Sequence, residues 1–131
     1  MPTPAEIRAR ILSAPDSKTA ACPAPEWGIP DLHVRVLSGA ERDTWETLLV
    51  ASREAPPGAP RNLRASLAVL AACTPDGTRI FTEADVADLG KKSSAVLHRI
   101  WQAALALNRL DDSSAEAVEK NSGGVPGDSL S

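Results

Sequence analysis

The sequence predicts a mainly α-helical domain with a small antiparallel β-hairpin near its N-terminus, an α+β fold. The longest run of apolar residues with helical spacing covers residues 93–110. Residues 32–37 instead alternate between apolar and polar side chains, as in a half-buried strand. The 131 residues are 43% hydrophobic and 24% charged, which fits one soluble domain with a modest core. We therefore expect a compact globular domain over residues 1–121 and a disordered tail over residues 122–131.

A short helix is expected over residues 4–14. Its proline suits the first helical turn, where a missing N–H is tolerated. Ile7, Ile11 and Leu12 form a narrow apolar stripe on this helix.

The hairpin is expected over residues 18–37. Two antiparallel strands are joined there by a bend around Trp27 and Gly28. Pro23 and Pro25 cannot donate ladder hydrogen bonds, so we expect the first strand to lie at an edge of the sheet.

Two helices separated by a loop are expected in the middle of the chain. Ser38 and Glu41 have the spacing of a capping box, which predicts a helix over residues 39–53. Residues 54–60 contain three prolines and a glycine and are expected to form a loop. Leucines at positions i, i+4 and i+7 then predict a helix over residues 61–73.

A brief helix is expected over residues 82–89, after a short extended piece. Thr82 and Asp85 form a variant of the capping pattern in which a short acid replaces glutamate. Gly90 is a suitable residue to end this helix.

The helix over residues 93–110 is the element best able to organise the core. Ser93 is its expected N-cap. Its apolar side is made of Val96, Leu97, Ile100, Trp101, Ala104, Leu105 and Leu107. A last short helix is expected over residues 113–121, before the Gly- and Ser-rich tail over residues 122–131.

Charge and composition argue against several classes of function. The formal net charge is −3, and residues 61–110, with seven basic and four acidic groups, are too weakly basic to indicate nucleic-acid binding. No catalytic constellation, phosphate-binding loop or cofactor motif is present, so we expect a protein that is not an enzyme. No apolar run approaches a membrane span and no signal peptide is evident, so a cytoplasmic location without membrane contact is expected.

The cysteines do not indicate a metal site. Cys22 and Cys73 are far apart and have no local ligand spacing with His33 or His98. We expect two ordinary, partly buried thiols; a disulfide is possible, but nothing points to an oxidising compartment.

Five residues are candidates for contact with a partner protein. Trp27 lies in a bend between prolines and either staples the hairpin or anchors a partner. Trp45 is a candidate for the core and for partner contact, whereas Trp101 is expected in the core. Glu54, Pro56 and Pro57 belong to an open proline-rich loop that is expected beside a partner surface.

Several motifs, taken in order, resemble the tail assembly chaperones of long-tailed, siphovirus-type bacteriophages. They cover most of residues 5–122, and their order and spacing make the resemblance persuasive. The motifs are Pro25-Glu26-Trp27-Gly28, Val34-Arg35-Val36-Leu37-Ser38-Gly39-Ala40-Glu41-Arg42-Asp43, Cys73, Asp76-Gly77, Arg79-Ile80-Phe81, Asp85-Val86, Leu89-Gly90, Lys92-Ser93, Leu107-Asn108-Arg109-Leu110 and Glu119-Lys120-Asn121-Ser122.

The resemblance implies a non-enzymatic protein of the host cytoplasm that is absent from the finished virion. Such a chaperone binds the long tape-measure protein, keeps it soluble and helps recruit the tail-tube subunits of the major tail protein. The partners that the resemblance suggests also include a second copy of the chain and a longer product made by ribosomal frameshifting. The family has no catalytic residues to assign to this chain.

Two other classes of function are alternatives. A structural virion component, such as a head-tail connector or minor tail protein, would remain in purified particles. A small regulatory or adaptor protein of the host is the third class, and a salt-sensitive DNA affinity would favour it.

Overall fold

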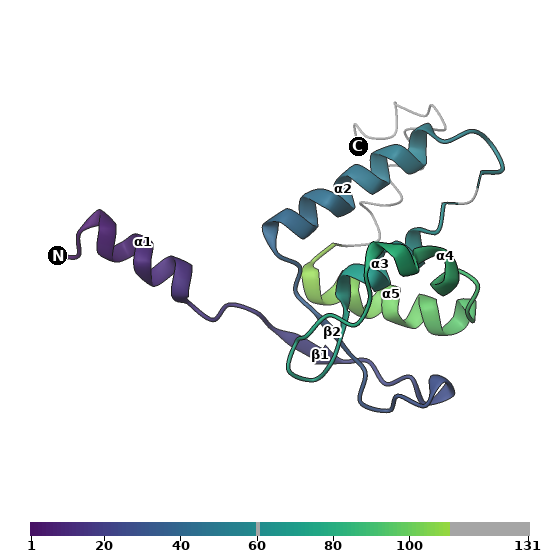
Figure 1. Cartoon of the computed structure of the whole chain (residues 1–131), viewed down its shortest axis with the longest axis horizontal. Coiled ribbons are helices and arrows are strands. Elements are labelled where there is room, and N and C mark those ends of the chain that lie inside the picture. Colours follow the sequence, from purple (N-terminus) through teal and green to yellow (C-terminus); the bar gives the residue numbers. More distant parts are fainter. Residues whose placement is uncertain (60, 111–131) are drawn as a thin grey trace, which may run out of the picture.

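A layer of helices packed on a short antiparallel sheet forms the body of the molecule (Figure 1). The computed structural model describes residues 1–59 and 61–110. In chain order the elements are α1 (Pro4–Ser13), β1 (Thr19–Ala21), the 3-10 turn η1 (Pro25–Trp27), β2 (His33–Arg35), α2 (Gly39–Glu54), α3 (Leu63–Ala71), β3 (Ala72–Cys73), the 3-10 turn η2 (Glu83–Asp85), α4 (Val86–Leu89) and α5 (Ser94–Asn108). The predicted α+β class with an N-terminal hairpin is confirmed.

The sheet has the order β1-β2-β3, with both pairings antiparallel. Strand β1 lies at an edge, as its neighbouring prolines predicted. Strand β3 was not predicted, because its residues were expected at the end of a helix over 61–73. The helix stops because the backbone of Ala72 turns extended (φ −66°, ψ 134°) and pairs with Val34 of β2. This long-range pairing overrides the helical preference of the local sequence.

Helices α3 and α5 occupy the centre of the body. Residues 65–71 of α3 are all buried, so this short helix is surrounded rather than amphipathic. The predicted apolar side of α5 is confirmed, with Leu107 half-buried and the rest buried. Ser93 caps α5 by accepting a hydrogen bond from the Val96 N–H at 3.5 Å.

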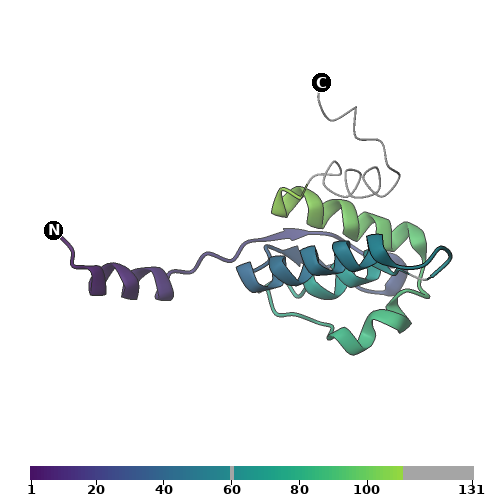
Figure 2. The ribbon, with the colours of Figure 1, turned by 90° about the horizontal axis from the view of Figure 1, so that it is seen from above.

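Helix α1 lies outside this body. Thr3 and Glu6 form a complete capping box at its start, yet none of its residues is buried. Figures 1 and 2 show it standing away from the other elements at the end of an extended stretch. The predicted helix is therefore present, but it is separate from the packed body rather than part of the globular domain expected over residues 1–121.

The predicted helix over residues 82–89 is divided into η2 and α4. The Thr82 N–H donates to the Asp85 carboxylate at 2.8 Å, which confirms the expected contact at its start. Gly90 follows α4 in a right-handed conformation (φ −63°), so it does not supply the left-handed cap typical of glycine. The expected helix over 113–121 and the tail over 122–131 lie outside the described residues. None of the helices described is long and apolar enough to cross a bilayer.

Candidate partner-binding site

Trp27 lies at the end of η1, in the turn between β1 and β2. Its ring is half-buried and packs against the core. Ile29 follows two residues later and is exposed. The turn therefore presents an apolar pair of which one member is anchored and the other is free to meet a partner.

The turn that carries Trp27 is fixed to helix α5. Arg99 of α5 donates to both carboxylate oxygens of Glu26, at 2.9 and 2.5 Å, and to the Pro23 carbonyl at 2.9 Å. The hydrogen bond from Arg99 is the main reason that the pKa of Glu26 falls to about 2. Gly28 then reverses the chain at φ 75°, a conformation that glycine adopts without steric cost. A partner would thus meet a preorganised turn rather than a loose loop.

Trp45 is a core residue, which corrects the hypothesis that it contacts a partner. Only 2% of it is exposed, because it lies on the inner side of α2 with Leu49. Its ring packs edge-on against Trp101, with the ring centroids 5.6 Å apart and the planes at 73°. Its role is to join α2 to α5.

Glu54 ends helix α2, and Pro56 and Pro57 follow it in an exposed loop. The loop predicted over residues 54–60 is present over the described residues 55–59, because α2 continues through Glu54. Contact of these three residues with a partner stays a prediction. Figure 1 shows this loop and the turn carrying Trp27 on opposite sides of the helical layer. The five candidate residues therefore do not form one site.

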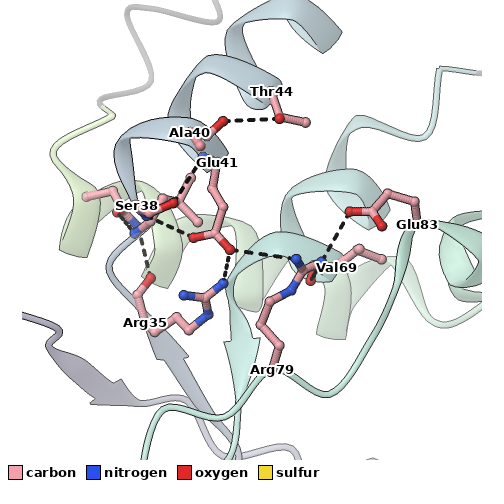
Figure 3. Close-up of polar contacts among 10 residues, drawn as sticks. Arg35, Ser38, Ala40, Glu41, Thr44, Val69, Arg79 and Glu83 are labelled. Atoms are coloured by element: carbon pink, nitrogen blue, oxygen red, sulfur yellow. Dashed lines mark hydrogen bonds and ion pairs between the residues drawn. The ribbon is translucent and has the colours of Figure 1, made fainter.

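A polar cluster at the start of α2 was not foreseen beyond its capping box (Figure 3). Glu41 accepts a hydrogen bond from the Ser38 N–H at 2.8 Å and one from Arg35 of β2. Arg79 reaches the same carboxylate at 3.6 Å and donates to the Val69 carbonyl at 3.2 Å. Burial alone would raise the pKa of Glu41, but the hydrogen bonds from Arg35 and Ser38 outweigh burial and lower it.

The end of α5 is tied to the same region by Asn108. Its side chain accepts from the Leu37 N–H at 2.7 Å and donates to the Arg35 carbonyl at 3.2 Å. Arg35, Ser38, Glu41 and Asn108 all belong to motifs that carry the family resemblance. Those motifs therefore contribute the polar contacts that hold β2, α2 and α5 together.

Two surface hollows were also missed by the sequence analysis. One, of about 360 Å³, lies on the outer side of α2 and is lined by Asp43, Glu46, Thr47 and Val50. The other has a similar volume and lies between the starts of α3 and α5, and its lining includes basic residues. There Arg64 donates to His98 at 3.2 Å and stands 5.5 Å from the centre of the Trp101 ring.

In the part of the chain that the structure describes, no three His, Cys, Asp or Glu side chains lie close enough together to hold a metal ion. Cys22 and Cys73 are both buried free thiols. Burial raises the pKa of each thiol, so both are poorly reactive.

The arrangement of helices and sheet is similar to that of a solved structure, the tail assembly chaperone of bacteriophage HK97. The similarity covers 82% of this chain and 99% of that chain, with a TM-score of 0.56 and 17% sequence identity. The chain has the fold of a bacteriophage tail assembly chaperone. No protein-family model matches the sequence, and no curated protein matches it significantly. At this level of identity the likeness to the HK97 chaperone rests on the fold and not on individual residues.

Proposed function

We propose that this protein is a phage tail assembly chaperone that binds the tape-measure protein, keeps it soluble and helps recruit the subunits of the tail tube. The observation that supports the proposal most is the fold shared with the HK97 chaperone along nearly the whole of that chain. The motifs of residues 25–110 support the same proposal independently of the fold comparison. They were identified from the sequence alone, by their order and spacing along the chain.

The turn that carries Trp27 and Ile29 is the proposed contact for the tape-measure protein. A long apolar partner is best kept soluble by many weak, repeated contacts, and helix-in-groove recognition uses such apolar anchors. Ile29 is exposed, and the turn is held on α5 by Glu26 and Arg99. Binding there would therefore lose little conformational entropy of the chaperone.

The proposal is tested by co-expressing this chain with the tape-measure protein encoded nearby, then measuring its soluble fraction and its recovery in a pull-down. We expect the chain to keep the tape-measure protein soluble and to be purified with it. Ile29→Glu should weaken recovery without changing the melting temperature, because Ile29 is exposed. Ile80→Glu is the matched control, since Ile80 is exposed to nearly the same extent, 45% against 43%. Precipitation of the tape-measure protein in the presence of the chain would refute the proposal.

The same proposal includes a non-enzymatic role in the host cytoplasm and absence from the mature virion. Mass spectrometry of purified particles checks the last point. Recovery of this chain from particles at a fixed ratio to the major tail protein would favour a structural virion component instead.

A further inference from the structure

Helix α1 is a formed helix of which no residue is buried by the part of the chain that the structure describes, residues 1–59 and 61–110. Its first turn is closed by hydrogen bonds between Thr3 and Glu6 at 3.2 Å in both directions. Ile11 and Leu12 are nevertheless 66% and 68% exposed, and Ile7 is 44% exposed. A short isolated helix in water is marginally stable, so one with an exposed apolar stripe gains most when the stripe is covered.

The outer side of α2 offers an open, acidic surface that also carries an exposed apolar residue. Asp43, Glu46, Thr47 and Val50 occupy positions i, i+3, i+4 and i+7, so they lie along one face of the helix and line the hollow there. Val50 supplies an exposed apolar floor, being 44% exposed. The hollow extends over about 10 Å of helix, and the stripe from Ile7 to Leu12 over about 8 Å.

The charges of the two surfaces are complementary. Helix α1 carries Arg8 and Arg10, and its acid, Glu6, is used by the capping box. Neither arginine takes part in the ion pairs found in residues 1–59 and 61–110. On α2, Glu46 pairs with Arg42 at 3.4 Å, whereas Asp43 has no basic partner among the described residues. An arginine of α1 placed near Asp43 would give this carboxylate an ion-pair partner.

The connection between α1 and the body leads the helix away from its own α2. Ala14 is extended (φ −68°, ψ 133°), as expected before Pro15. The chain is fixed again at Lys18, whose carbonyl accepts from the Val36 N–H at 2.9 Å. Both views show α1 beyond the N-terminal end of α2, with the N-terminus of the chain at the end of α1 that is farther from the body (Figures 1 and 2). This geometry favours a surface on another molecule.

From these observations we infer that α1 is an exchange arm that docks its Ile7, Ile11 and Leu12 stripe on the acidic hollow of α2 in a second copy of this chain. The stripe of α1 and the hollow of α2 are different surfaces, so each copy can dock its own arm on a neighbour and also accept a neighbour's arm. The inference does not depend on the proposed chaperone function, because it concerns this chain alone.

The first test is sedimentation of the full chain over a wide range of concentration. We expect the mass to rise above that of the 13.7 kDa monomer as concentration increases. Ile7→Glu together with Ile11→Glu should raise the dissociation constant by about tenfold or more, because the arm loses its apolar stripe. Glutamate is a good helix former, so α1 itself is retained. Ile80→Glu, at a site elsewhere that is as exposed as Ile7, should leave association unchanged.

A variant of the acceptor surface gives the second test. Val50→Arg removes the apolar floor and repels the arginines of the arm, while an i, i+4 pair with Glu46 preserves α2. This variant alone should associate as weakly as the arm variant. An equimolar mixture of the two should associate again, because intact arms of one variant meet intact hollows of the other.

Three outcomes would overturn the inference. A monomer at every concentration would mean that the arm has no acceptor in a second copy or folds onto its own chain. Association that survives both variants would place the interface elsewhere. A mixture of variants that stays as weakly associated as its components would show that arm and hollow do not meet.

Discussion

Helices α1 and α5 begin in the same way and end up in opposite environments. Each is preceded by a hydroxyl residue that caps it, Thr3 for α1 and Ser93 for α5, and the cap of α1 is the more complete. Helix α5 buries six residues and α1 buries none. Caps decide where a helix begins, whereas long-range packing decides whether that helix stabilises the fold. The predictions below test this difference, from the largest expected effect to the smallest.

The same substitution in the two helices should have very different consequences. Ile100→Ala in α5 creates a cavity at a fully buried position and should lower the free energy of unfolding by about 2–5 kcal/mol. Ile11→Ala in α1 should change it by less than about 0.5 kcal/mol, because its side chain is largely exposed. Urea unfolding at low protein concentration measures both. Similar losses in the two variants would contradict the separation of α1 from the core.

The polar cluster around Glu41 should be the next most sensitive part of the body. Its carboxylate compensates Arg35 and Arg79, whose Nε atoms are buried without a hydrogen-bond partner in the described residues. Glu41→Gln should therefore cost about 1–3 kcal/mol of stability. Glu46→Gln on the exposed side of the same helix should cost less than about 0.5 kcal/mol. Equal losses in urea unfolding would show that the cluster is not structurally important.

The pH dependence of stability should reflect Glu41 in a definite direction. The folded state lowers its pKa, so its stabilising contribution is complete above the pKa of the unfolded chain. The contribution is lost as pH falls through the lower pKa of the folded state. Urea unfolding from neutral to acidic pH should show this loss, and Glu41→Gln should reduce it.

The contact between Glu26 and Arg99 should be visible as a local titration shift. Arg99→Gln should raise the pKa of Glu26 from about 2 towards its ordinary value of 4.5, because the charged hydrogen bonds are lost. Carboxyl NMR titration measures this pKa directly. An unchanged pKa would mean that the η1 turn is not fixed to α5 in solution.

The smallest effect is expected at the C-terminus. Deletion of residues 122–131 should leave the melting temperature unchanged, because their Gly- and Ser-rich composition supplies little to a core. A clear fall in melting temperature after this truncation would contradict the prediction.

The local sequence was sufficient to predict most helices and the hairpin, but it was not sufficient to predict the contacts between them. The capping residues Ser38 and Ser93 located the starts of α2 and α5 within one residue. Strand β3 was missed because Ala72 pairs with Val34, thirty-eight positions earlier in the chain. A pairing between residues so far apart in the chain leaves no periodic pattern in the local sequence.

The candidate site was predictable to a smaller extent. The bend at Trp27 and the exposed loop at Pro56 followed from glycine and proline positions. Sequence alone could not show that Arg99 fixes the bend, or that Arg79 meets Glu41. The apolar stripe of α1 predicted a helix but could not show that the stripe stays uncovered by the other described residues.

Amide hydrogen exchange of the full chain at low and at high concentration tests the contrast between α1 and α5 most directly. We expect the amides of α5 to be protected at both concentrations, because they open only with the core. Those of α1 should exchange rapidly in the dilute sample and become protected in the concentrated one, where a second copy covers the arm. Protection of α1 equal to that of α5 in the dilute sample would contradict the account, because it would place α1 within the core.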